Sequence, residues 1–167
     1  HAYQSVAGSG CKVLDTRKTT PGQRLLEKWA IRVGGGSNHR MGLWDAVLIK
    51  ENHAQAAGGV RKAAKAALAS KPSNADLILE VRDLDELNSV LDLPLTRVLL
   101  DNFTPDLVSQ ALRMRDASKA TFALEVSGGI TLDTLAAYAA AGAQYASVGA
   151  LTHSTMPLDL SLLLEGL

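Results

Sequence analysis

The stretch Asp15-Thr16-Arg17-Lys18-Thr19-Thr20-Pro21-Gly22 joins a short apolar run to a segment with helical periodicity. It places two cations, together with hydroxyl and backbone donors, where a strand would end and a helix would begin. Parallel α/β proteins bind anions at such junctions, because N–H groups and the positive end of the helix point there. The stretch therefore predicts a strand–loop–helix unit with an anion site in its loop.

Two further basic groups lie at the next breaks in the pattern. The stretch Gly34-Gly35-Gly36-Ser37-Asn38-His39-Arg40 follows the first helical segment, and Lys50 closes the apolar run that begins at Ala46. Residues 12–50 hold eight Lys or Arg and three Asp or Glu, a net charge of +5, in a chain that is neutral overall. Positive charge is thus concentrated in one segment, which favours a local site for small anions.

Composition predicts one soluble α/β domain that spans residues 1–167. With 47% hydrophobic residues the chain can bury a single substantial core. Its apolar runs are far shorter than the roughly 20 residues that cross a bilayer, so we expect no membrane association and a cytoplasmic location. Balanced charge and 4% aromatic residues argue against a nucleic-acid surface. Cys11 is the one cysteine, so no disulfide forms within the chain.

Short apolar runs alternate with helical segments six times along the chain. The expected strands are residues 12–15, 46–50, 77–82, 97–101, 122–127 and 145–149. The expected helices are residues 22–33, 54–70, 84–91, 105–118, 132–141 and 158–164. Continuously apolar strands are typical of parallel sheets covered by helices on their faces. A complete (β/α)₈ barrel needs about 250 residues, so the pattern predicts an incomplete (β/α) barrel of about six parallel strands.

Polar residues end every predicted strand, and in such barrels the site lies at the carboxyl ends of the strands. They are Arg17, Lys18, Lys50, Glu80, Asp101, Ser127 and Gly149. Taken singly, each could be an ordinary surface residue or a member of an ion pair. We interpret their shared position as a candidate site.

Glycine-rich loops after the last two strands indicate a phosphate site. They are Ser127-Gly128-Gly129-Ile130-Thr131 and Ser147-Val148-Gly149-Ala150. Glycine lets backbone N–H groups approach an anion, and the helix expected after Thr131 adds its dipole. Glu80 and Asp101 fit either ribose hydroxyls or a Mg²⁺ ion bound mainly through ligand phosphates. His53 is expected to lie in a loop. We interpret Gly58-Gly59 as a site of close packing or as a break in the helix expected at 54–70.

Seven motifs, in chain order, resemble those of the nicotinate-nucleotide pyrophosphorylase family, also called quinolinate phosphoribosyltransferase. They are DTRKTTPG at 15–22, RLLEK at 24–28, GGG at 34–36 with NHR at 38–40, VLIK at 47–50 with NH at 52–53, LLDNF at 99–103, EVSGGI at 125–130 and SVGALTH at 147–153. A paralogue linked to molybdenum transport shares the first motif, but Asn38-His39-Arg40 and Leu48-Ile49-Lys50-Glu51-Asn52-His53 favour the biosynthetic enzyme. The resemblance implies a type II phosphoribosyltransferase barrel.

The resemblance also implies a reaction. Phosphoribosyl pyrophosphate and quinolinate would give nicotinate mononucleotide, pyrophosphate and CO₂ in NAD synthesis, with Mg²⁺ held largely by substrate. The residues implied to hold the quinolinate carboxylates are Arg17, His39, Arg40 and Lys50. The catalytic residues that the resemblance implies are Lys18, Glu80 and Asp101, which would contact phosphoribosyl pyrophosphate. Glu80 and Asp101 would also lie near the metal. Those implied for the phosphoribosyl and phosphate side are Thr16, Ser127, Gly128, Gly129, Val148, Gly149, Ala150 and His153.

Family members carry an N-terminal sandwich domain and a helix before the barrel, and we expect this chain to begin after both. The resemblance implies a homodimer or higher oligomer whose sites are completed across subunits, so the barrel alone is expected to turn over poorly. Two alternatives remain open at this point. One is another phosphate-binding barrel enzyme, an isomerase or lyase, and the other is a non-catalytic phosphate-binding or assembly fragment.

Overall fold

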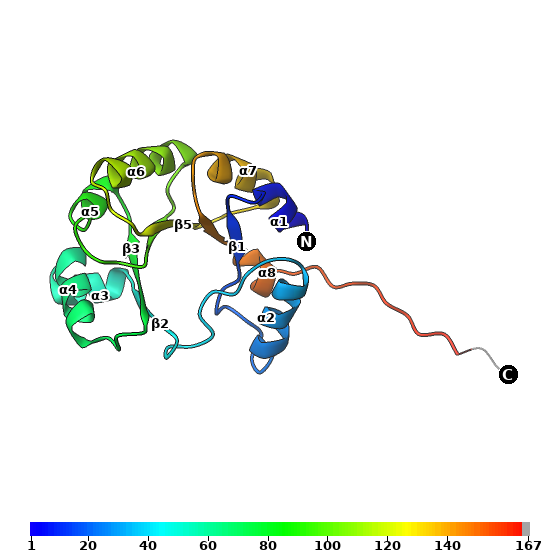
Figure 1. Ribbon diagram of the computed structural model, residues 1–167. Helices are drawn as coiled ribbons and strands as arrows, with labels where there is room; N and C mark the ends of the chain where they lie inside the picture. Colours follow the sequence, from blue (N-terminus) through cyan, green and yellow to red (C-terminus); the bar gives the residue numbers. More distant parts are fainter. Residues whose placement is uncertain (165–167) are drawn as a thin grey trace.

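The computed structural model describes residues 1–164 and forms one curved, all-parallel sheet of six strands. The strand order is β1-β6-β5-β4-β3-β2. The strands are β1 (Lys12–Leu14), β2 (Ala46–Ile49), β3 (Asp76–Val81), β4 (Arg97–Asp101), β5 (Ala123–Ser127) and β6 (Tyr145–Ser147). The helices are α1 (Ala2–Ala7), α2 (Arg24–Val33), α3 (Glu51–Ala57), α4 (Val60–Ser70), α5 (Leu84–Asn88), α6 (Pro105–Ala117), α7 (Leu132–Ala140) and α8 (Ala150–His153). The helices surround the outside of the sheet (Figure 1).

The sheet stays open between β1 and β2, which confirms the predicted incomplete barrel. The segment that follows α2 partly fills this gap. Ser37 donates its N–H to the Val13 carbonyl at 2.8 Å and accepts the Asp15 N–H at 3.3 Å. Together these bonds make one isolated parallel bridge beside β1. The loop of residues 37–40 is therefore held where a further strand would close the barrel.

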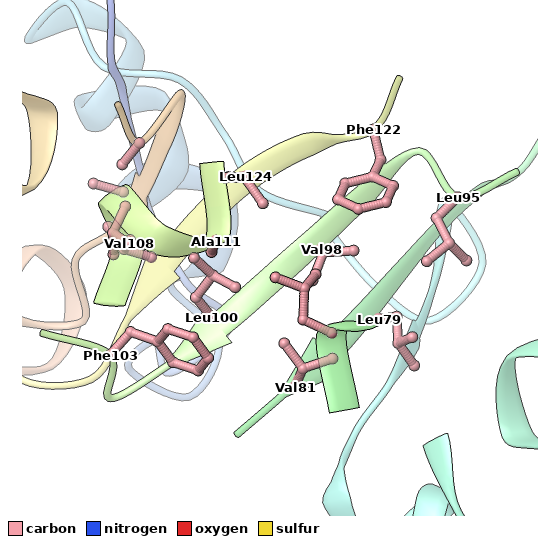
Figure 2. Close-up of a cluster of buried hydrophobic side chains, with 14 of the residues drawn as sticks. Leu79, Val81, Leu95, Val98, Leu100, Phe103, Val108, Ala111, Phe122 and Leu124 are labelled. Carbon is pink, nitrogen blue, oxygen red and sulfur yellow. The ribbon is translucent and has the colours of Figure 1, made fainter. Parts of the chain in front are cut away.

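Side chains alternate between the two faces of the sheet. The outward-facing residues of β3, β4 and β5, such as Leu79, Val98 and Leu124, are fully buried beneath the helices. Figure 2 shows this layer packing against Val108 and Ala111 of α6. The inward-facing residues form a second, smaller apolar cluster at the barrel centre: Ala46, Leu48, Ile78 and Leu99. At the carboxyl ends of the strands, further inward positions are polar: Asp101 of β4 and Glu125 and Ser127 of β5 line a cavity there.

Capping residues explain where several helices begin. The Thr104 side chain caps α6, with Pro105 at its first position, and Thr131 caps α7 by accepting the Thr134 N–H. The expected helix 54–70 is instead two helices, α3 and α4, because Gly58 (φ 77°) and Gly59 (φ 123°) adopt conformations that glycine favours. His53 lies in α3 and not in a loop, and its Nδ1 accepts the Lys50 N–H at 2.9 Å.

Both ends of the described chain differ from expectation. A helix, α1, precedes β1 and contacts α7, where the periodicity predicted no helix. The helix expected at 158–164 is also wrong, since this segment is extended and runs away from the barrel (Figure 1). Its leucines are 79% to 91% exposed, and so short a helix is marginal without packing. Within residues 1–164, no helix has the length and apolarity needed to cross a membrane.

Candidate functional site

A single cavity of about 620 Å³ lies at the carboxyl ends of the strands, a size typical of ligand sites. It brings together thirteen of the residues singled out from the sequence: Thr16, Arg17, Lys18, His39, Arg40, Lys50, Asp101, Ser127, Gly128, Gly129, Gly149, Ala150 and His153. Two others lie outside its lining. Glu80 is mostly buried behind Lys50, and Val148 is fully buried with its N–H donated to the Leu14 carbonyl at 2.9 Å.

Two arginines form a cationic wall on the side of the cavity where the barrel is open. Burial and then the neighbouring charge of Arg17 lower the pKa of the Arg40 guanidinium, against the opposing effect of Asp45. Arg17 Nε is buried, and no acceptor in residues 1–164 takes its hydrogen bond. Two like charges held this close, one with an unused donor, favour an anion between them.

Arg24 of α2 holds the loop that carries Arg17. Its guanidinium donates to Thr19 Oγ1 at 3.1 Å, to the Arg17 carbonyl at 3.2 Å and to the Met41 carbonyl at 3.3 Å. These bonds join the loop after β1 to the loop after α2. Arg24 therefore fixes the wall from behind and does not line the cavity.

A buried polar network anchors the same loops from below. Asp15 is fully buried and forms an ion pair with Lys28 of α2, which is 1% exposed. Asp15 also accepts from Asn38 Nδ2 at 2.5 Å and from the His39 N–H at 2.9 Å. Lys28 Nζ in turn donates to the His39 carbonyl at 2.9 Å. No role was predicted for Lys28 from the sequence, although Lys28 belongs to the RLLEK motif at 24–28.

Glu125 is a further cavity residue that sequence reasoning missed. It lies in the middle of β5, faces the barrel interior and is fully buried. Burial alone would raise its pKa, but His39, then Arg97 and the Ser147 hydroxyl, lower it below the usual value. An ionised side chain between Leu124 and Val126, in an otherwise apolar strand, was the signal in the sequence.

Backbone N–H groups of the glycine-rich loops also border the cavity. The N–H groups of Gly128, Gly129, Gly149 and Ala150 donate to no acceptor within residues 1–164. Gly128 (φ 91°) and Gly129 (φ 60°) turn the chain so that it borders the cavity. Thr16 Oγ1 lies 3.1 Å from Thr152 Oγ1, which ties the loop after β1 to α8. This grouping of free N–H groups is suited to a phosphate.

The two carboxylates on adjacent strands have different surroundings. Asp101 lines the cavity, accepts from Ser127 Oγ at 3.0 Å and from Asn102 Nδ2 at 2.8 Å. Glu80 Oε2 is paired with Lys50 Nζ at 2.6 Å. Residues 1–164 contain no group of three acidic, His or Cys side chains that would enclose a metal. Of these two carboxylates, Asp101 is therefore the one that borders the cavity.

Comparison with known proteins gives a consistent result. A family model described as "Quinolinate phosphoribosyl transferase, C-terminal domain" matches residues 1–163. A Mycobacterium leprae protein named nicotinate-nucleotide pyrophosphorylase [carboxylating] is 46% identical over 95% of this chain and 55% of its own length. A chloroplastic protein of the same name from Arabidopsis thaliana is 41% identical over 95% of this chain and 50% of its own.

The solved nicotinate-nucleotide pyrophosphorylase of Francisella tularensis superimposes with a TM-score of 0.85. It shares 43% identity over 95% of this chain and 56% of that one. The chain thus spans about half the length of the relatives that it matches. Because the family model covers nearly all of it, the chain belongs to the quinolinate phosphoribosyltransferase family and corresponds to the C-terminal domain of that family.

Proposed function

We propose that this chain is the barrel that transfers phosphoribosyl from phosphoribosyl pyrophosphate to quinolinate. Decarboxylation then gives nicotinate mononucleotide, pyrophosphate and CO₂ for NAD synthesis. The observation that carries this proposal is one cavity lined both by an arginine pair and by free backbone N–H groups. Such a cavity matches a ligand with carboxylates at one end and a phosphate at the other.

The proposed roles follow the chemistry of the residues that line the cavity. Arg17 and Arg40 would bind the quinolinate carboxylates, with His39 beside them. Lys50 would also contact a quinolinate carboxylate, but its ammonium group would be shared between that carboxylate and Glu80, to which it is paired at 2.6 Å. Lys18, which is exposed at the rim, would meet the pyrophosphate. The glycine loops and His153 would hold the 5′-phosphate.

The proposed chemistry is electrostatic and needs no covalent nucleophile. Negative charge leaves with pyrophosphate and develops on the pyridine ring as CO₂ departs. Fixed cations and N–H groups can stabilise both charges without rearranging, which is an effective form of catalysis. Mg²⁺, when bound with phosphoribosyl pyrophosphate, would neutralise the leaving group, and Asp101 is the residue placed to meet it, with Glu80 behind.

We also propose a homodimer or higher oligomer in the cytoplasm, with no nucleic-acid or membrane partner. An apolar stripe on α2 supports an oligomer, since Leu25, Trp29 and Val33 are 64% to 71% exposed. The Cys11 thiol is buried, and burial raises its pKa to about 11.

Removal of either wall arginine should weaken quinolinate binding selectively. Arg17→Ala or Arg40→Ala loses a charged hydrogen bond worth roughly 1.5–3 kcal/mol, on the order of 10- to 150-fold in the dissociation constant. Phosphate affinity should change less than threefold, by roughly 0.6 kcal/mol. Calorimetric titration with each ligand makes the comparison. Arg113→Ala, on the exposed face of α6, is the matched control. Equal losses for both ligands would contradict the assignment.

Asp101→Asn should raise the Mg²⁺ concentration needed for phosphoribosyl pyrophosphate binding by more than Glu80→Gln does. Asp101 lines the cavity, whereas Glu80 is committed to Lys50. We expect a shift of about tenfold for Asp101→Asn, the effect of one charged contact of about 1.4 kcal/mol. Titration of Mg²⁺ at fixed phosphoribosyl pyrophosphate measures it. An unchanged metal dependence in both variants would leave the carboxylates as structural ion-pair members.

A further inference from the structure

The barrel interior contains a buried charge cluster beneath the proposed site. Glu125 on β5 is fully buried, and its two oxygens have different partners. Oε2 accepts from Arg97 NH1 on β4 at 2.8 Å. Oε1 accepts from Ser147 Oγ on β6 at 2.5 Å and lies 3.4 Å from His39 Nε2. The carboxylate thus spans the barrel from its own wall to the loop that fills the gap.

The His39 ring has contacts at both nitrogens. Nδ1 accepts the Arg40 N–H at 2.7 Å, so the neutral ring carries its proton on Nε2. That Nε2–H then faces Glu125 Oε1. The His39 side chain is 8% exposed, which leaves little freedom for it to turn. Both contacts therefore favour one tautomer and one ring orientation.

We infer that Glu125 is a positioning residue that holds the His39 ring as its Nε2–H tautomer and so keeps His39 and Arg40 in place in the cavity. His39 and Arg40 lie in the gap-filling loop, which pairs with β1 through Ser37, while Arg40 NH1 donates to the Ala46 carbonyl of β2 at 3.0 Å. Glu125 reaches the loop from across the barrel, while Asp15 holds the His39 N–H from beneath. His39 is thus held by two carboxylates, Asp15 at its backbone and Glu125 at its ring.

A neutral amide cannot replace this carboxylate. Arg97, Ser147 and the His39 Nε2–H are three donors, and an ionised carboxylate can accept from all of them. A glutamine NH₂ at the Oε2 position would face the Arg97 guanidinium, donor against donor. A glutamine NH₂ at the Oε1 position would face His39 Nε2 and would need that nitrogen as a hydrogen-bond acceptor. The ring proton would then lie on Nδ1, where it would point at the Arg40 N–H, donor against donor.

Other charged groups surround His39 without supplying the same contact. Asp15 meets its backbone N–H, and Lys28 meets its carbonyl. Arg40 and Arg17 line the cavity next to it, and Arg97 stacks over the Tyr145 ring at 4.2 Å on the far side of Glu125. Among the described residues, Glu125 is therefore the carboxylate that faces the ring itself.

The test is nitrogen-15 NMR of the His39 ring in wild type, Glu125→Gln and Glu125→Asp. Wild type should show Nε2 protonated and Nδ1 bare. Glu125→Gln should show both tautomers and faster exchange of the ring proton. Glu125→Asp keeps the negative charge beside Arg97, but its side chain is one methylene group shorter and so lies farther from His39. This variant serves as the folded comparison if Glu125→Gln does not fold. Ser147→Ala leaves the carboxylate in place and should keep the wild-type ring signals.

A second measurement connects the ring to ligand binding, and this part rests on the proposed function. Quinolinate affinity should fall about tenfold in Glu125→Asp, as for the loss of one charged contact, while inorganic phosphate affinity stays within twofold. Unchanged ring signals in both Glu125 variants would overturn the inference. If wild type binds no quinolinate, the proposed function fails, and the ring signals alone decide the inference.

Discussion

Lys28→Met is expected to lower the free energy of unfolding by about 3–5 kcal/mol, the cost of leaving one partner of a buried ion pair uncompensated. Asp15 is fully buried, and Lys28 is the cation that pairs with it. Methionine has a similar length but no charge, so the carboxylate would remain in the interior with only the Asn38 and His39 donors. Urea unfolding monitored by circular dichroism measures the change.

Two controls separate charge from packing. Lys65→Met on the exposed face of α4 should change stability by less than about 0.5 kcal/mol, as is usual for surface sites. The double variant Asp15→Asn with Lys28→Met removes both charges and should recover part of the loss. A Lys28→Met protein as stable as wild type would show that the pair contributes nothing to the fold.

Gly128→Ala should remove most phosphate binding, by more than about 100-fold. Gly128 has φ 91°, and a Cβ there would lie 2.0 Å from Asn102 Oδ1 and 3.1 Å from the Asn102 backbone nitrogen. Asn102 has little room to move, because its N–H donates to Ser127 and its side chain donates to Asp101. The loop must shift, and losing two charged N–H contacts costs roughly 3–6 kcal/mol.

Gly129→Ala is the matched control for that substitution. Gly129 also has a positive φ, 60°, but a Cβ there meets no atom within 4 Å. It tests backbone strain alone, which costs roughly 1–2 kcal/mol for a left-handed residue. Titration with inorganic phosphate should rank the affinities as wild type, Gly129→Ala and then Gly128→Ala. Equal losses in the two variants would mean that the contact with Asn102 is unimportant.

The sequence predicted the strands well because each is a short apolar run that is covered by helices. The carboxyl-end rim was predictable for the same reason, since parallel strands bring their ends to one edge. Arg17 in the loop after β1 and Ser127 at the end of β5 were predicted to share one site, and both line the cavity. Their roles toward ligands stay predictions.

The α2 helix shows why other features could not be predicted. Its apolar residues Leu25, Trp29 and Val33 are exposed, while Lys28 is 1% exposed. Periodicity alone would assign the opposite orientation, because it assumes that apolar side chains face the core. Lys28 instead faces inward and pairs with Asp15, a contact across thirteen residues that no local pattern encodes.

Glu125 and the segment 158–164 show two further limits. A single carboxylate in an apolar strand marks a special position but does not identify its partners, which come from β4, β6 and the loop after α2. The leucine spacing at 158–164 favours a helix, but a helix this short needs a surface to pack on. In the structure this segment contacts no such surface and is extended.

Titration of nicotinate mononucleotide into the 167-residue chain tests the central claim most directly. This molecule carries a carboxylate at one end and a phosphate at the other. We predict binding at one site per chain, competition by both quinolinate and inorganic phosphate, and separate losses of affinity in Arg40→Ala and Gly128→Ala. Binding that phosphate does not displace, or no binding at all, would contradict the account of this cavity as a phosphoribosyltransferase site.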